Sequence, residues 1–126
     1  MKKIINTTNA PGAIGPYSQG VNIGNLVYTS GQLPISMETG ELELEDIKKA
    51  TKNSLDNVKA ILEDQGLSMA DVFKTTVFVT DLADFGAVNE VYATYFEANP
   101  PARSCVQVAA LPKGAKVEIE AIAVVK

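Results

Sequence analysis

The sequence predicts a single α+β domain in which two helices cover one face of an antiparallel-rich sheet. Apolar residues recur at helical spacing in two segments, short β-branched and aromatic runs surround them, and Gly or Pro separates the segments. The resulting element order is ββ-α-β-α-ββ. Each helix has one apolar stripe to bury, which favours helices packed on one sheet face. A chain of 126 residues has the length of one domain, so we assign residues 1–126 to a single domain.

The first two predicted strands form a hairpin within residues 18–34, SQGVNIGNLVYTSGQLP. Val21 and Ile23 precede a turn at Gly24-Asn25, and an apolar run follows it. Residues 34–43 then form a loop with a turn at Thr39-Gly40.

Two helices are predicted, over residues 45–65 and 84–98. Both have one apolar side, and each ends at a residue type that stops helices: Gly66 after the first and Pro100-Pro101 after the second. The apolar positions are Ile47, Ala50, Leu55, Val58, Ile61 and Leu62 in the first helix, and Phe85, Val88, Tyr92, Tyr95 and Phe96 in the second.

Three further strands are predicted, over residues 72–80, 102–110 and 117–125. The last two are joined by a short turn segment, LPKGAK, so we expect them to be hairpin neighbours. In the last strand Glu118, Glu120, Ile122 and Val124 share one face, which is acidic at its start and apolar at its end. An apolar second sheet face favours self-association.

The composition excludes several classes of site. The chain has no histidine and one cysteine, so it contains no Ser-His-Asp triad, His-ligated metal site or internal disulfide. We therefore expect no metal and no cofactor. The net charge of −4 lacks the basic excess of a nucleic-acid-binding protein, and no window is apolar enough for a membrane span. The start, MKKIINTTNAPG, has no secretory apolar core, so a cytoplasmic location is expected.

The segment PPARSCVQV, residues 100–108, places an arginine and the only cysteine in a predicted strand. Arg103, Cys105 and Gln107 share one face of an extended chain. Arg103 has two interpretations: a structural ion pair with Glu118 on the neighbouring strand, or a clamp for an anionic ligand. Cys105 is more typical of a small packing residue than of a nucleophile, because no histidine is present to activate it.

Other polar residues have ordinary structural interpretations. The glycine-rich GAIGPYSQG lacks the Gly-Lys-Ser/Thr end of a phosphate loop. Taken alone, Tyr17 is typical of a half-buried packing residue, Ser30 before Gly31 of a turn hydroxyl, and Asn89 of a cap or packing amide.

Seven segments together resemble the Rid/YjgF family, whose members include reactive intermediate deaminases. The segment PARSCVQVAALPKGAKVEIEA at residues 101–121 is close to the family signature. The other six are APGAIGPYSQG at 10–20, YTSGQLP at 28–34, TGE at 39–41, NVKAILE at 57–63, KTTVFVTDLADF at 74–85 and VNEVYATYF at 88–96.

The resemblance implies a chorismate-mutase-like fold and a homotrimer with active sites between subunits. It implies an enzyme that hydrolyses 2-iminobutanoate and 2-iminopropanoate, released by pyridoxal-phosphate-dependent dehydratases, to 2-keto acids and ammonia. Arg103 would then bind the substrate carboxylate and Glu118 would position the water. Four cleft residues and one adjacent glycine complete the expected site: Tyr17, Ser30, Gly31, Asn89 and Cys105.

Two alternative functions remain open from the sequence. Members of the family have been labelled endoribonucleases and translation inhibitors, although the acidic charge balance disfavours RNA as a substrate. A non-catalytic regulatory protein that binds small carboxylates is the second alternative. Retention of Glu118 together with Arg103 favours turnover, because binding alone needs no water-positioning carboxylate.

Overall fold

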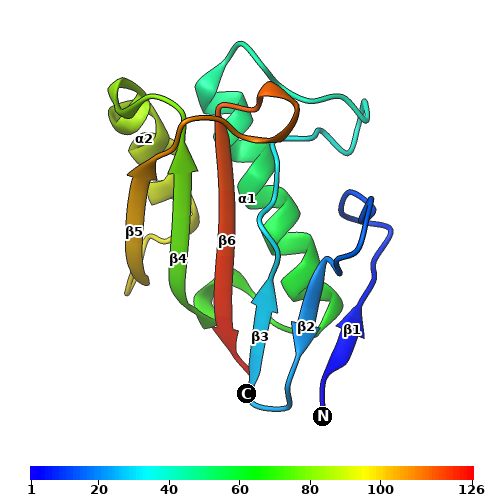
Figure 1. Cartoon of the computed structure of the whole chain (residues 1–126). Coiled ribbons are helices and arrows are strands. Elements are labelled where there is room, and N and C mark those ends of the chain that lie inside the picture. Colours follow the sequence, from blue (N-terminus) through cyan, green and yellow to red (C-terminus); the bar gives the residue numbers. More distant parts are fainter.

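The computed structural model describes residues 1–126 as a six-stranded sheet with two α-helices on one face (Figure 1). The predicted α+β class is therefore confirmed. Of the five pairs of neighbouring strands, only β4 and β5 run parallel. The strands are β1 (Lys3–Ile5), β2 (Gly20–Asn22), β3 (Leu26–Thr29), β4 (Val72–Val79), β5 (Ala102–Gln107) and β6 (Val117–Val124), in the spatial order β1-β2-β3-β6-β4-β5.

The helices are α1 (Ile47–Asp64) and α2 (Phe85–Tyr95), within the two segments predicted to be helical. Asp46 caps α1, because its carboxylate accepts hydrogen bonds from the backbone nitrogens of Lys48 at 2.9 Å and Lys49 at 3.2 Å. Three short 3-10 helices occupy connections: η1 (Met69–Asp71), η2 (Leu82–Asp84) and η3 (Pro112–Gly114). None of the helices is both long and apolar enough to cross a membrane.

The core lies between the helices and the sheet. A cluster of 20 buried apolar residues fills this layer. Alternate residues of β6, from Val117 to Ala123, are buried toward the helices, and α1 buries its predicted stripe against them. The other β6 residues, including Glu118, therefore face the open side of the sheet.

The predicted element order lacked one strand. Residues 3–5 pair with β2 in antiparallel register, so the order is βββ-α-β-α-ββ. A three-residue strand has no alternation that a sequence pattern can detect, and here tertiary pairing with β2 defines it.

The prediction that the last two strands are hairpin neighbours is wrong. β4 lies between β5 and β6 and pairs with both of them. α2 connects β4 to β5 as a crossover, which makes these two strands parallel neighbours. The segment after β5 then crosses the end of β4 before β6 begins (Figure 1).

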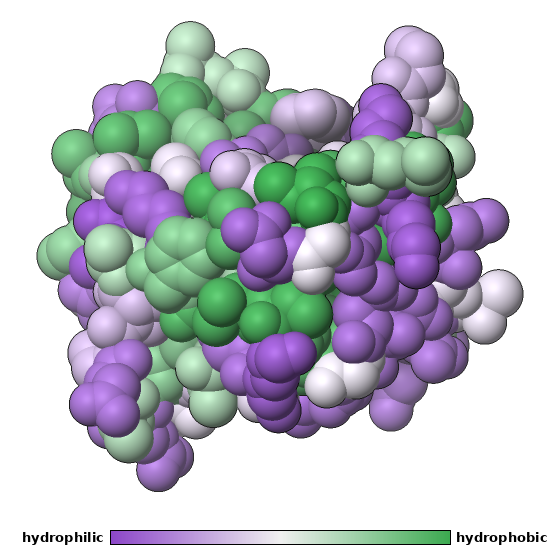
Figure 2. Space-filling model, turned by 90° about the horizontal axis from the view of Figure 1, so that it is seen from below, coloured by the Kyte–Doolittle hydropathy of each residue, from purple (hydrophilic) through white to green (hydrophobic).

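The sheet face opposite the helices carries exposed apolar side chains. Figure 2 views the molecule from below and not onto this sheet face; at that end of the molecule hydrophobic residues gather at the centre and upper left, and hydrophilic residues fill the right. Large apolar residues that are more than 40% exposed on the strands are Ile4, Tyr28, Phe73, Val106 and Val124.

Candidate active site

Arg103 is held in a fixed orientation by one face of α2. Its Nη1 donates a hydrogen bond of 2.6 Å to Oδ1 of Asn89. Its guanidinium carbon lies 4.8 Å from the ring centre of Tyr92 and 5.3 Å from that of Phe85. Both distances lie within the range of cation–π attraction. The guanidinium is therefore oriented by one amide and two aromatic rings.

The Tyr92 ring is itself fixed from the sheet. Its hydroxyl forms a 2.7 Å hydrogen bond with Oγ1 of Thr75, which is 1% exposed. Burial raises the pKa of Tyr92 above its ordinary value, despite the lowering effect of this hydrogen bond and of Arg103. Tyr92 thus stays a neutral phenol at physiological pH, and Thr75 of β4 limits its movement.

Arg103 has no carboxylate partner within the chain. The three ion pairs in the structure involve lysines only, and Arg103 forms none of them. The interpretation of Arg103 and Glu118 as a structural ion pair is therefore wrong for this chain. Only Nη1 of the Arg103 guanidinium donates a hydrogen bond, so the remaining N–H groups are free to donate to a carboxylate.

Cys105 lies two residues beyond Arg103 on the same face of β5, opposite Val77 of β4. Its side chain is half-buried and packs against the core cluster. Burial raises the pKa of the Cys105 thiol, and the opposing effect of Arg103 is smaller. The neutral thiol therefore predominates at neutral pH, which is unfavourable for a nucleophile.

Glu118 lies beside a separate cavity of about 410 Å³. Tyr17, Ser30 and Gly31 line this cavity with it, and Lys113 of η3 adds a cation at its wall. Burial raises the pKa of Glu118, and repulsion from Glu120 raises it further.

Gly31 allows the Glu118 side chain to occupy this position. A Cβ atom at Gly31 would lie 2.7 Å from Cδ and 2.9 Å from Cγ of Glu118. Such separations are shorter than normal van der Waals contact, so any larger residue would displace the carboxylate. The absence of a side chain at Gly31 therefore defines one wall of the Glu118 site.

Buried amides position the loops around Glu118. Gln19 is 2% exposed, and its Nε2 donates to the carbonyl oxygens of Thr7 and Pro11, both at 2.9 Å. Asn57 of α1 donates to the carbonyl oxygens of Leu33 at 3.2 Å and Ile35 at 2.9 Å. These bonds fix the segments before Tyr17 and after Gly31, which together form the cavity.

The structure divides the seven predicted site residues into two groups. Arg103, Asn89 and Cys105 lie together on the helix side of β5. The other group borders the Glu118 cavity and consists of Tyr17, Ser30, Gly31 and Glu118. Neither group holds three or more His, Cys, Asp or Glu side chains arranged for a metal ion.

The two groups do not meet within one chain. Arg103 and Ala121 both lie opposite Thr75 of β4, on its two sides, and Ala121 follows Glu118 by three residues on β6. The Cα atoms of Arg103 and Glu118 are therefore roughly 14 Å apart, because two inter-strand spacings and the rise of three residues lie between them. The side chains also point to opposite faces of the sheet, so the two groups stay apart within one chain.

Comparison with known proteins identifies the family of the chain. Residues 7–125 match the family model described as Endoribonuclease L-PSP. The 2-iminobutanoate/2-iminopropanoate deaminase of Escherichia coli K12 is 57% identical over 127 residues, which cover 98% of each chain. The chain belongs to the Rid/YjgF family. The family resemblance of the sequence is thereby confirmed.

Solved structures of Rid/YjgF proteins share the fold across nearly the whole chain. The crystal structure of E. coli TdcF with bound serine has a TM-score of 0.94 at 56% identity, covering 98% of this chain and 99% of that one. The E. coli YjgF gene product has a TM-score of 0.94 at 55% identity with the same coverage. The Rid/YjgF fold predicted by the resemblance is confirmed.

Three residues that lie beside Arg103 or Glu118 were not predicted from the sequence: Phe85, Tyr92 and Lys113. Phe85 lies four residues before Asn89 and Tyr92 three residues after it, so the helical spacing places both rings on the same helix face as Asn89. Their apolar character led us to assign them to the core alone. No pattern in the sequence predicts that Lys113 lies beside Glu118, because this position depends on a left-handed backbone at Lys113, with φ of 59°.

Proposed function

We propose that this protein hydrolyses small 2-imino acids, such as 2-iminobutanoate and 2-iminopropanoate, to 2-keto acids and ammonia. The observation that carries the proposal is the oriented guanidinium of Arg103, which has no carboxylate partner in its own chain. The 57% identity to the E. coli deaminase with this activity supports it. The serine bound to E. coli TdcF is also an α-carboxylate ligand.

Arg103 would bind the substrate carboxylate through two parallel hydrogen bonds. A guanidinium fork matches the geometry of a carboxylate, and the Phe85 and Tyr92 rings restrict its orientation. This contact fixes the iminium carbon two bonds away relative to the rest of the cleft. Such positioning contributes to the rate because an iminium carbon is already electrophilic and needs no activated side chain as nucleophile.

Glu118 would orient the attacking water and accept its proton. The water oxygen bonds to the iminium carbon, and the carbon–nitrogen π electrons move to nitrogen. Glu118 then returns the proton to the nitrogen of the carbinolamine and the C–N bond breaks. The hydroxyl oxygen forms the carbonyl and gives its proton back to Glu118, so ammonia and the 2-keto acid leave as the products. A pKa raised by burial brings the carboxylate closer to the basicity that this proton transfer needs.

The active site would form between subunits of a homotrimer. Within one chain Arg103 and Glu118 face opposite sides of the sheet, so a second copy is needed to bring them to one substrate. The exposed apolar residues of the open sheet face supply a surface for this association. No metal, cofactor or nucleic acid enters the proposed reaction, and we expect it to take place in the cytoplasm.

A coupled assay tests the proposed function. Purified protein is added to a pyridoxal-phosphate-dependent threonine or serine dehydratase, and the 2-keto acid is followed over time. We expect the keto acid to appear faster than in the dehydratase reaction alone. Unchanged kinetics, with serine still bound by the protein, would instead support the regulatory carboxylate-binding alternative. RNA cleavage that falls steeply with added salt would support the endoribonuclease alternative.

A further inference from the structure

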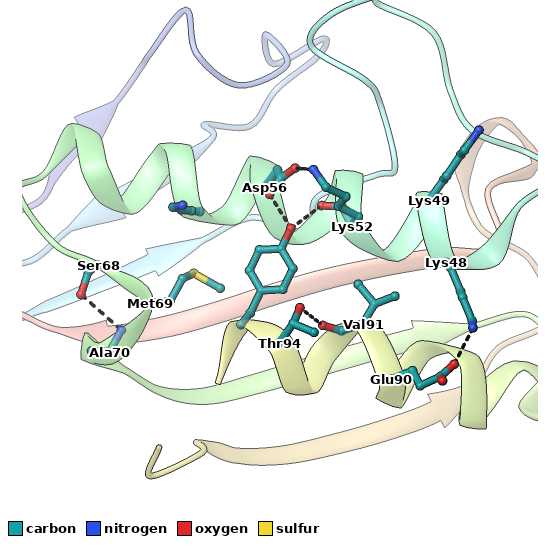
Figure 3. A pocket seen from close by; sticks show the side chains of 12 residues that line it. Lys48, Lys49, Lys52, Asp56, Ser68, Met69, Ala70, Glu90, Val91 and Thr94 are labelled. Atoms are coloured by element: carbon teal, nitrogen blue, oxygen red, sulfur yellow. Dashed lines mark hydrogen bonds and ion pairs between the residues drawn. The ribbon is translucent and has the colours of Figure 1, made fainter. Parts of the chain in front are cut away.

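A groove between α1 and α2 lies outside both groups of active-site residues (Figure 3). Its volume is about 910 Å³, more than twice that of the cavity beside Glu118, at about 410 Å³. Small-molecule sites typically have volumes of about 300–1000 Å³. The ion pair between Lys48 and Glu90 bounds one end of the groove, and η1 with Ser68 bounds the other (Figure 3).

The floor of the groove is apolar and has a fixed aromatic ring. Met69, Val91 and the Tyr95 side chain line it. The Tyr95 hydroxyl donates to Oδ1 of Asp56 on α1, which ties the ring across the gap between the helices. Burial and the adjacent Asp56 raise the pKa of Tyr95, so the ring carries no charge at physiological pH. A flat apolar body can therefore pack on this floor.

The charges of the groove are unbalanced at one end. Lys48, Lys52 and Lys59 follow one face of α1 at helical spacing. Glu90 pairs with Lys48, and Asp56 pairs with Lys52 at 2.7 Å. Lys59 has no ion pair.

A hydroxyl donor lines the same cavity as Lys59. Ser68 Oγ accepts a 3.2 Å hydrogen bond from the backbone nitrogen of Ala70, and its O–H is free to donate. Lys49 points away from α2 (Figure 3). Lys49 and Lys59 are thus the two groove lysines without an ion pair, and Lys59 is the one that shares its end of the groove with Ser68.

We propose that this groove binds a small organic anion with a flat apolar body, of the aromatic carboxylate class. The apolar body packs on Met69, Val91 and Tyr95, and the carboxylate binds Lys59 and Ser68. A neutral ligand would leave the ammonium of Lys59 unpaired, and a cationic ligand would be repelled by it. In the proposed trimer the partner subunit meets the face of α2 that carries Asn89 beside Arg103, whereas the groove lies on the face of α2 that carries Val91, Thr94 and Tyr95.

Titration of the ¹⁵N-labelled protein with naphthalene-2-carboxylate tests this proposal by NMR. Naphthalene-2-methanol serves as the neutral ligand of matched shape. We expect saturable shifts of the backbone amides of Lys59, Ser68, Ala70 and Thr94, with weaker binding of the alcohol. Because Arg103 would also bind carboxylates under the proposed function, the titration is repeated with Arg103→Ala. The groove shifts should persist in that variant.

Substitution of the groove lysine provides the second measurement. Lys59→Gln should weaken carboxylate binding by about threefold to fivefold, as expected for loss of an exposed ion pair. Lys3→Gln removes the same charge from the distant strand β1 and should leave the affinity unchanged. The proposal is wrong if the shifts disappear in Arg103→Ala, if acid and alcohol bind equally, or if Lys59→Gln has no effect. Since Arg103→Ala leaves the groove intact, these outcomes do not depend on the deaminase proposal.

Discussion

Arg103 on β5 and Glu118 on β6 lie on opposite faces of one sheet, with β4 between their strands. Arg103 faces α2 and contacts Asn89, whereas Glu118 faces the open side and packs against Gly31. A single substrate cannot contact both side chains within one chain. Substitutions at each position separate the contributions of the two residues, and mixed assemblies test whether a second subunit brings them together.

Replacement of Arg103 by lysine should abolish most of the activity although the positive charge is kept. An ammonium cannot reproduce the bidentate fork or its stacking between Phe85 and Tyr92. One or two charge-assisted hydrogen bonds contribute about 1.5–3 kcal/mol each, so kcat/KM should fall between about tenfold and about ten-thousandfold. The kcat/KM of Arg103→Ala should fall by a similar factor. A folded Arg103→Lys protein with the wild-type rate, checked by circular dichroism, would contradict the clamp.

Mixed trimers should recover activity that neither parent variant has. In the proposed assembly each site takes Arg103 from one subunit and Glu118 from another. An equal mixture of Arg103→Ala and Glu118→Gln is unfolded and refolded so that the subunits combine at random in closed trimers. About a quarter of the sites should then hold an intact Arg103 from one subunit and an intact Glu118 from its neighbour. Light scattering should give three times the 13.4 kDa mass of the chain. A trimer without recovered turnover would mean that both residues act within one chain.

Glu118→Gln should slow hydrolysis and make the protein more stable at neutral pH. The raised pKa of Glu118 means that the folded state holds its proton at pH values where the unfolded state has released it. The free energy of unfolding therefore falls as pH rises from the ordinary glutamate pKa, about 4.3, through the raised one. The difference in Tm between variant and wild type should grow from acidic to neutral pH.

An exposed glutamate serves as the control for this stability effect. Glu38 is exposed in the loop before α1, and the difference in Tm between Glu38→Gln and wild type should show no comparable increase with pH. If Glu118→Gln were instead less stable than wild type at neutral pH, Glu118 would be paired with a cation in the assembled protein.

Gly31→Ala should reduce turnover through displacement of the Glu118 carboxylate. The new methyl group would lie 2.7 Å from Cδ of Glu118, so the side chain has to move. Gly12→Ala is the matched control, because it lines the same cavity and a Cβ there meets nothing within 4 Å. Steady-state kinetics should show a lower kcat for Gly31→Ala and little change for Gly12→Ala. Equal rates for both variants would remove the geometric role of Gly31.

Cys105→Ser should retain measurable deaminase activity. The proposed attack uses water, and burial keeps the thiol protonated near neutral pH. A loss of packing against the core is the only expected cost, visible as a lower Tm. A folded but inactive Cys105→Ser protein would make the cysteine the leading nucleophile.

The helix boundaries and the two faces of β6 follow from local patterns in the sequence. Asp46, Gly66 and the apolar spacing of α1 act through neighbouring residues, so they define the helix without knowledge of the fold. The alternation of Val117, Glu118 and Ile119 likewise assigns each side chain to a face. These features depend on interactions between residues close together in the chain.

Strand order and the pairing of site residues were decided only by the tertiary structure. The short segment between β5 and β6 favoured a hairpin, but the α2 crossover places β4 beside β5 and separates Arg103 from Glu118. The stacking of Arg103 on Tyr92, with Thr75 behind it, joins residues of β5, α2 and β4. Sequence patterns report which face a residue occupies, because that depends on local backbone geometry. Which element lies opposite that face depends on the burial of the whole apolar core, to which distant segments contribute together.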